Sequence, residues 1–284
     1  MAIDYDKALG MPPWRVEQDF THRDTIIYAL AVGLGQDPTD ERELTFLYEK
    51  RLAALPTYAS TLAWKRLAEV DIGMTYTKMV HADQRMVLHR PPPVSGAVHT
   101  ELRVKEIVDR GAEKGAVVYF ERKLFEAGVA DPVSTQTLGI MARADGGFGG
   151  PERSLLPIHN LPERAPDQVC KLPTSPRSAL IYRLTGDVNP LHIDPETARK
   201  AGFDRPILHG LCTYGVCGFA VLKSVLNYDA SRLLELDGRF SAPVLPGDLL
   251  EADIWVDGDE VSLRVRAPER NVVVFNNGRA KIKT

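Results

Sequence analysis

The stretch Tyr182-Arg-Leu-Thr-Gly-Asp-Val-Asn-Pro-Leu-His192 places a carboxylate, Asp187, five residues before an imidazole, His192. In a continuous helix these two positions would lie on diverging faces, because one turn takes about 3.6 residues. Asn189-Pro190 predicts that the helix ends in a loop, since a residue before proline favours extended backbone. Such a loop can turn the carboxylate and the imidazole toward one water molecule. The two groups would then form a general acid/base pair.

The longer pattern around this stretch resembles that of a known family. It consists of Gly186-Asp-Val-Asn-Pro-Leu-His192, the following Ala198, and Ile207-Leu-His-Gly-Leu-Cys-Thr-Tyr214. This pattern is similar to the signature of the type 2 (R-specific) enoyl-CoA hydratases, the MaoC-like dehydratases of the hotdog superfamily. The resemblance is strong over roughly residues 175–282 and weaker over roughly residues 1–145.

The N-terminal part of the chain resembles the C-terminal part. Thr21-His-Arg-Asp-Thr-Ile-Ile-Tyr-Ala-Leu30 matches Ser175-Pro-Arg-Ser-Ala-Leu-Ile-Tyr-Arg-Leu184, and both predict an amphipathic helix after a hydroxyl residue suited to its N-cap. Each half later carries a Pro-Val turn, at Pro93-Val-Ser-Gly96 and at Pro243-Val-Leu-Pro-Gly247. The alternative to a repeat is that two amphipathic helices resemble each other by chance. The matching Pro-Val turns in both halves disfavour that alternative. The sequence therefore predicts two tandem copies of one α+β unit.

Segments typical of strands follow these turns, at His99–Val104, Ala116–Phe120, Leu249–Val256, Glu260–Arg266 and Val272–Phe275. Asp257-Gly258 predicts a hairpin, and Leu211–Leu226, apolar nearly all round, predicts a buried helix. The resemblance implies a double hotdog, in which each of two units wraps a curved antiparallel sheet around one long central helix. We place the N-terminal unit at residues 1–145, a Gly- and Pro-rich linker at 146–174 and the C-terminal unit at 175–284.

Composition excludes several other classes of protein. The chain has 284 residues, of which 44% are hydrophobic and 26% charged, as in an ordinary globular protein. Its net charge of -3 disfavours nucleic-acid binding, and its three cysteines predict neither a disulfide framework nor a zinc site. Without an evident leader or an apolar run of membrane-spanning length, we expect a cytoplasmic protein that does not engage a membrane. A homodimer is one option for the oligomeric state, which the sequence leaves open.

The resemblance also implies roles for particular residues. Asp187 and His192 would hold the attacking water and carry both proton transfers, with base and acid left unassigned. Gly210 lies just before the predicted central helix, whose first N–H groups lack internal partners and lie at the positive end of the helix dipole. The family uses the matching glycine N–H to bind the thioester oxyanion. Asn189 is expected to form the turn and orient the site, and His209 to orient the loop, with catalysis by His209 as the weaker alternative.

Other interpretations of these residues stay open. Asp187 alone could cap a turn, and His192 alone could be structural. Asp187, His192, Asp194 and His209 include the ligand types of a two-histidine-one-carboxylate metal site. No spacing selects that site and the resemblance argues against it, so we expect neither a metal nor another cofactor. Arg239 is the candidate for binding the phosphates of CoA, with a solvated surface arginine as an equal alternative.

The function predicted from these residues is reversible hydration of trans-2-enoyl-CoA to (R)-3-hydroxyacyl-CoA, which makes the chain a hydro-lyase with an acyl-CoA substrate. The alternatives are a dehydratase for a specialised acyl-CoA or an acyl-carrier-protein substrate, a hotdog thioesterase, and a non-catalytic acyl-CoA-binding protein. In the first unit Gly35 and Asp40 stand opposite Asp187 and His192, so the pair is missing there. We expect that unit to accommodate the acyl chain, with Ile26–Val32 lining the pocket.

Overall fold

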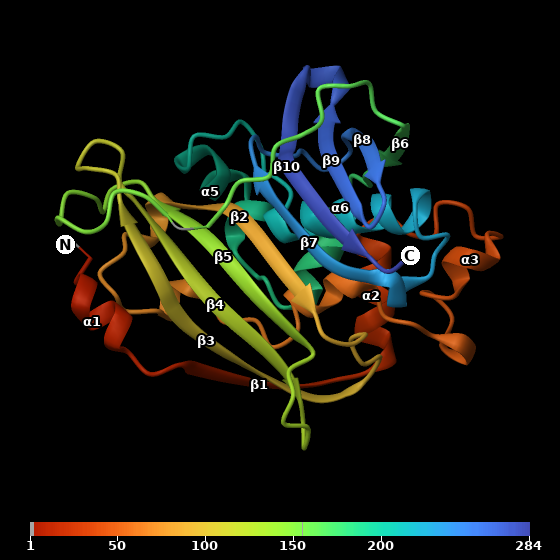
Figure 1. The fold of residues 1–284 in the computed structure, drawn as a ribbon, viewed down its shortest axis with the longest axis horizontal. Helices are drawn as coiled ribbons and strands as arrows, with labels where there is room; N and C mark the ends of the chain where they lie inside the picture. Colours follow the sequence, from red (N-terminus) through yellow and green to blue (C-terminus); the bar gives the residue numbers. More distant parts are fainter. Residues whose placement is uncertain (1–2, 155) are drawn as a thin grey trace.

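The protein is described here by a computed structural model covering residues 3–154 and 156–284. Its main feature is one sheet of ten strands in the order β1-β3-β4-β5-β2-β7-β10-β9-β8-β6 (Figure 1). Every neighbouring pair is antiparallel. The strands are β1 (Trp14–Phe20), β2 (Met79–Leu88), β3 (Gly96–Asp109), β4 (Ala116–Glu126), β5 (Ser134–Ala142), β6 (Gln168–Pro173), β7 (Leu233–Phe240), β8 (Leu249–Asp257), β9 (Glu260–Ala267) and β10 (Val272–Ile282).

The strand order repeats itself. Read inward from each edge, the first half runs β1-β3-β4-β5-β2 and the second runs β6-β8-β9-β10-β7. Each strand number in the second half is five higher than its counterpart in the first, so both halves have the same topology. The halves join where β2 pairs with β7, with Asp83 opposite Arg239 and Val87 opposite Glu235. This topology confirms the predicted tandem α+β units. The predicted hairpin is also present, because β8 ends at Asp257 and Gly258 adopts a positive φ of 66° in the turn.

One long helix lies against the second half of the sheet. The helices are α1 (Tyr5–Gly10), α2 (His22–Ala31), α3 (Glu41–Leu44), α4 (Ser178–Tyr182), α5 (Pro195–Lys200) and α6 (Gly210–Ser224). Every residue of α6 from Leu211 to Leu222 is buried, and the helix contacts β6, β7, β8 and β10 (Figure 1). A helix that is apolar all round is stable only inside a core, so the predicted buried helix at Leu211–Leu226 is confirmed.

The first half departs from the prediction of a long central helix in each unit. Within the described residues only α6 exceeds ten residues, and the first half presents to it the short 3-10 helix η2 (Pro56–Ser60). Side chains of the sheet donate hydrogen bonds to backbone carbonyls of this region. Arg122 donates to the carbonyls of Ala59 and Leu62, and Gln136 also donates to the carbonyl of Ala59. These hydrogen bonds occupy part of the acceptor capacity of the segment, and the proline that opens η2 has no N–H to donate.

The predicted linker, residues 146–174, also needs a correction. Its last part forms β6, an edge strand whose Cys170 and Leu172 face the core, so the second set of strands begins before residue 175. The alternation of buried and exposed residues in β6 covers only six residues, which is too short to predict a strand from the sequence. Leu155, in the same linker, lies outside the described residues. The other boundaries between the units stay predictions.

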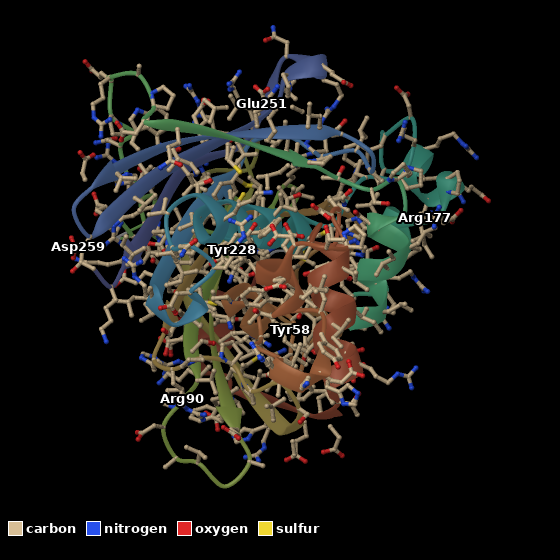
Figure 2. The ribbon with its side chains drawn as sticks, turned by 90° about the vertical axis from the view of Figure 1, so that its right-hand side faces the viewer. Tyr58, Arg90, Arg177, Tyr228, Glu251 and Asp259 are labelled. Atoms are coloured by element: carbon tan, nitrogen blue, oxygen red, sulfur yellow. The ribbon has the colours of Figure 1, made fainter. Side chains whose placement is uncertain are left out.

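Side chains fill the space between the sheet and the helices. Tyr58 and Tyr228 lie among these packed side chains, whereas Arg177 and Asp259 are exposed (Figure 2). One hydrophobic core, which includes α6, contains buried apolar residues of both halves, and a second core lies against β3, β4 and β5 of the first half. No helix in the part of the chain that the structure describes is long and apolar enough to span a bilayer.

Candidate active site

The predicted acid and imidazole lie on the loop between α4 and α5. The chain leaves the helical region at Gly186, whose φ of 122° favours glycine. Two consecutive side-chain turns then shape the loop. Asp187 Oδ1 accepts a hydrogen bond from the N–H of Asn189 (3.2 Å), and Asn189 Oδ1 accepts one from the N–H of Leu191 (3.1 Å). Asn189 thereby caps the 3-10 helix that ends at His192, as a turn-forming residue should.

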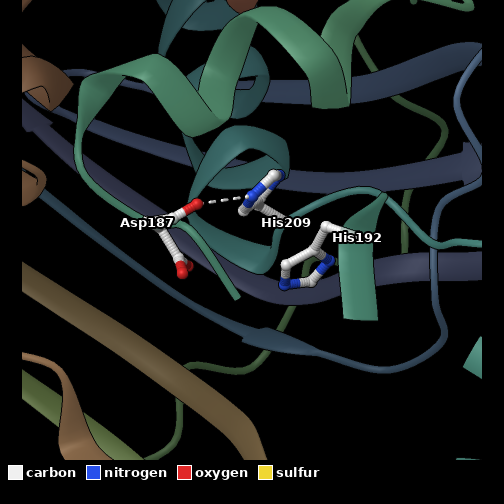
Figure 3. A group of neighbouring side chains, drawn as sticks. All are labelled: Asp187, His192 and His209. Carbon is white, nitrogen blue, oxygen red and sulfur yellow. Dashed lines mark hydrogen bonds between the residues drawn. The ribbon is translucent and has the colours of Figure 1, made fainter. Parts of the chain in front are cut away.

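Three side chains converge where this loop meets the start of α6. Atoms of Asp187, His192 and His209 that could bind a proton or an ion all lie within 4.8 Å of one another (Figure 3). The rings of His192 and His209 are stacked, with centroids 3.8 Å apart and planes 30° apart. His192 is 8% exposed and His209 is fully buried, whereas Asp187 is half-buried. The loop therefore brings the predicted pair together and adds a second histidine.

Backbone carbonyls fix the orientation of both histidine rings. His192 Nδ1 lies 2.9 Å from the carbonyl oxygen of Ile207, and His209 Nε2 lies 3.1 Å from that of Asp187. A carbonyl oxygen only accepts, so each of these two nitrogens carries a proton. In neutral His192 the other nitrogen, Nε2, is then bare and can accept a proton.

Burial keeps both imidazoles neutral. Desolvation lowers the pKa of His192, although the Asp187 charge and the Ile207 carbonyl oppose that shift. Desolvation, reinforced by the neighbouring His192, lowers the pKa of His209 to about 2. At neutral pH the site therefore holds two uncharged rings beside a carboxylate. Such a site can accept a proton on His192 during a reaction and release it again.

Gly210, the predicted oxyanion donor, is the first residue of α6. Among the described residues its N–H donates to no backbone or side-chain acceptor, as expected of the first position in a helix. A Cβ built at Gly210 would meet only the Phe240 ring, at 3.7 Å, which is ordinary van der Waals contact. Protein packing alone therefore does not require glycine there. The free N–H and the helix dipole favour an anionic group at this point.

Arg239 does not lie at this site. It is on β7, where Leu236 packs beneath α6 and Phe240 faces Gly210, so strand alternation turns Arg239 to the opposite face of the sheet. There it lines an open pocket of about 530 Å³ together with Asp83 and Arg85. The predicted placement of Arg239 at the mouth of the site is thus wrong, because sequence alone did not fix the side of β7 to which it points.

The same three side chains raise the question of a metal site. Asp187, His192 and His209 offer the right ligand types, whereas Asp194 instead caps α5 through the N–H groups of Glu196 and Thr197. Lone pairs of imidazole lie in the ring plane. Because the two rings are stacked with centroids 3.8 Å apart and planes only 30° apart, their lone pairs lie in two separate, nearly parallel planes. One ion in the plane of one ring would therefore lie out of the plane of the other.

Two aromatic residues of the first half lie beside the loop that carries Asp187 and His192, and the sequence did not indicate them. The Cβ of Trp64 is 3.7 Å from the position of a Cβ built on Gly186. The pKa of Tyr76 is raised by burial and by the charge of Asp187. Both aromatics belong to residues 64–78, which contain only short 3-10 turns and no periodic pattern. Only the folded chain brings this segment to the site.

Within the predicted lining of the acyl pocket, Ile26–Val32, one face is packed against protein, whereas Leu30 is 42% exposed and Ile26 and Ile27 are half-buried. Tyr28 is fully buried, Ala31 and Val32 are each 1% exposed, and Cys212 Sγ of α6 donates to the carbonyl of Ala31. This face of α2 therefore meets α6 and not an open space. Apolar residues on one helix face predict burial, but they do not say whether protein or ligand covers them.

Comparison with protein families assigns both halves of the chain. Residues 157–277 match the MaoC like domain, and residues 18–144 match the MFE-2 hydratase 2 N-terminal domain. The enoyl-CoA hydratase ChsH3 of Mycobacterium tuberculosis is 39% identical over 288 residues, covering 98% of each chain. The peroxisomal enoyl-CoA hydratase 2 of Arabidopsis thaliana is 35% identical and covers 90% of this chain and 88% of its own.

Solved structures agree with this assignment. A MaoC-like dehydratase from Phytophthora capsici superposes with a TM-score of 0.86 at 30% identity, covering 98% of each chain. A Mycobacterium tuberculosis protein described as having a double hotdog fold gives a TM-score of 0.60 at 15% identity, which bears on the fold alone. The fold is thus a double hotdog of the α+β class, as predicted. The chain belongs to the MaoC-like dehydratase family, in the form that carries a hydratase 2 N-terminal domain, and is a hydro-lyase.

Proposed function

We propose that the enzyme catalyses the reversible hydration of trans-2-enoyl-CoA to (R)-3-hydroxyacyl-CoA. The observation that carries this proposal is the approach of Asp187 to His192, whose Nε2 is bare when the ring is neutral, at the point where their loop meets the start of α6. The free N–H of Gly210 opens that helix, next to His209 of the same cluster. The relatives named as enoyl-CoA hydratases support the reaction and the CoA carrier. The (R) configuration rests on the resemblance to the R-specific hydratases.

In the proposed reaction one water molecule lies between Asp187 and His192. Its oxygen attacks Cβ of the enoyl group while the pair removes one of its protons. The same proton is then delivered to Cα, so the water supplies both the hydroxyl group and the new hydrogen. The pair returns to its starting protonation state. Such general acid/base catalysis typically contributes about 10²–10⁴ in rate.

The thioester oxygen carries negative charge while the new bond to Cβ forms. We assign its stabilisation to the N–H of Gly210, which lies at the positive end of α6. Removing one donor of this kind typically costs roughly 2.7–4 kcal/mol of barrier. Addition of water to an activated thioester consumes no electrons and needs no Lewis acid, so the proposal includes neither a metal nor a redox cofactor.

The first half is proposed to hold the acyl chain and to take no part in the proton transfers. It lacks the acid/histidine pair, since Gly35 and Asp40 occupy the matching positions. Trp64, which adjoins the catalytic loop at Gly186, replaces Ile26–Val32 as the candidate contact for the chain. An acyl group leaving the second half would meet this aromatic segment first.

Crotonyl-CoA is the probe that separates the competing functions. A hydratase removes the enoyl absorbance without releasing free thiol, a thioesterase releases thiol, and a binding protein leaves the compound unchanged. We expect the first outcome. Thiol release, or binding without turnover, would refute the proposed function. If crotonyl-CoA is not converted but crotonyl-acyl carrier protein is, the proposed reaction stands and the substrate carrier is acyl carrier protein.

A further inference from the structure

His209 has a position in the site that the roles of Asp187, His192 and Gly210 do not use. It immediately precedes Gly210, and its Nε2 donates to the backbone carbonyl of Asp187 at 3.1 Å. Its ring stacks on that of His192, with ring centroids 3.8 Å apart. The centroid of the Tyr182 ring lies 4.8 Å from that of His209. One fully buried side chain thus connects the start of α6 to both members of the catalytic pair (Figure 3).

The surroundings of His209 disfavour a second proton on its ring. Nε2 carries the proton that the Asp187 carbonyl accepts, and Nδ1 is buried with no partner among the described residues. The Asp187 carboxylate lies within 4.8 Å and its carbonyl accepts from His209, and both favour a positive charge there. Burial opposes that charge most strongly, and His192 and the Arg183 cation add to the opposition. Burial lowers its pKa to about 2, in agreement with this geometry.

We propose that His209 is a positioning residue, which fixes the backbone of Asp187 through its N–H and the ring of His192 through its face. It acts through these two residues and does not itself exchange a proton. The inference rests on the proposed function, because it assigns a purpose to geometry around the Asp187/His192 pair. A ring stacked on His192 also excludes water from one face of that imidazole. Dry surroundings keep His192 neutral and ready to accept a proton.

Three substitutions separate the two contacts of His209. His209→Gln keeps an N–H near the place of Nε2 and loses the ring. His209→Phe keeps a ring face and loses the donor, and His209→Ala loses both. The readouts are kcat, KM and the pH profile of kcat/KM with crotonyl-CoA. His99→Ala is the matched control, because His99 also stacks on an aromatic ring, that of Phe125 at 4.9 Å, on a strand of the first half.

We expect His209→Ala to lower kcat by about 10²-fold with little change in KM, the cost typical of a misplaced catalytic group. The acid limb of the kcat/KM profile of this variant should move to higher pH. The reason is that water admitted beside His192 raises the pKa of His192 toward its ordinary value. Gln should restore most of kcat and Phe should restore the position of the acid limb. The control should match the parent enzyme in all three readouts.

Several results would overturn the inference. One is a folded His209→Ala enzyme with parental kcat and parental pH profile. Another is equal loss in the Gln and Phe variants with an unmoved acid limb, which would mean that His209 serves packing alone. These two variants are close in size to histidine, so the comparison stands even if the alanine variant does not fold. A parent enzyme that fails to hydrate any enoyl thioester would overturn the proposed function as well. That result is distinguishable from failure of the His209 inference alone, in which the parent enzyme is active.

Discussion

Val32 occupies the space that a side chain at Gly215 would need. A Cβ built on Gly215 would lie 2.5 Å from Val32 Cγ1 and 2.7 Å from Tyr28 Oη. Gly215 is in the middle of α6, and Val32 follows α2, so this contact packs the first half directly onto the central helix of the second. Glycine weakens a helix interior by roughly 1 kcal/mol relative to alanine, and here it permits close approach.

We therefore expect Gly215→Ala to destabilise the protein. Overpacking a core typically costs about 1–3 kcal/mol, which outweighs the gain in helix propensity. The measurement is the urea midpoint followed by circular dichroism. Gly10→Ala is the control, because a Cβ there would meet nothing within 4 Å. A midpoint for Gly215→Ala at or above that of the parent would show that the halves do not depend on this contact.

Asp187→Asn and His192→Gln should each lower kcat by about 10²–10⁴-fold while the thermal unfolding curve stays close to that of the parent. Both changes preserve size and remove the ability to exchange a proton. The double variant should lose little beyond the worse single variant, because residues that act as a unit are not additive. Steady-state kinetics with crotonyl-CoA decide the matter. Near-parental turnover in either single variant would refute the assignment.

The pH dependence of stability should show that His209 is neutral. Its pKa is about 2 in the folded protein, whereas in the unfolded chain it protonates near the ordinary value of about 6.5. Below that value the unfolded state binds the extra proton, so stability falls with pH by up to about 1.4 kcal/mol per pH unit for this group. Asp237, whose burial raises its pKa to about 6, acts in the opposite direction, because its folded form binds a proton first.

The parent enzyme and His209→Gln should therefore be compared, since the contribution of Asp237 cancels between them. Free energies of unfolding are measured in urea between pH 6.5 and 4. The glutamine variant should lose stability less steeply as the pH falls. Parallel curves would mean that His209 is already charged, or water-exposed, in the folded state.

The acyl-chain role of the first half predicts a selective effect at Trp64. Trp64→Ala removes the large side chain whose Cβ lies closest to a Cβ built on Gly186, and it leaves Asp187 and His192 in place. The ratio of kcat/KM for long and short enoyl-CoAs should change by about tenfold or more, with crotonyl-CoA little affected. Phe125→Ala, remote on β4, is the control. Equal changes for short and long substrates would place the chain elsewhere.

The sequence predicted those parts of the molecule that depend on local patterns. The apolar run from Leu211 and the Asp257-Gly258 turn each determine an element directly, and the spacing of Asp187 and His192 marked the loop. The sequence did not predict the short η2, whose surroundings include Arg122 of the distant strand β4, which donates to the carbonyls of Ala59 and Leu62. The side to which Arg239 points likewise depends on the register between β2 and β7.

The configuration of the product formed from crotonyl-CoA tests the central claim most directly. In the proposed mechanism, Asp187 and His192 hold the water while the Gly210 N–H holds the thioester oxygen, so water would reach Cβ from one side only. The enzyme should convert crotonyl-CoA to (R)-3-hydroxybutyryl-CoA with little of the other enantiomer, and Asp187→Asn should abolish that product. A racemic or (S) product, or free thiol in place of a hydroxyacyl thioester, would contradict the account.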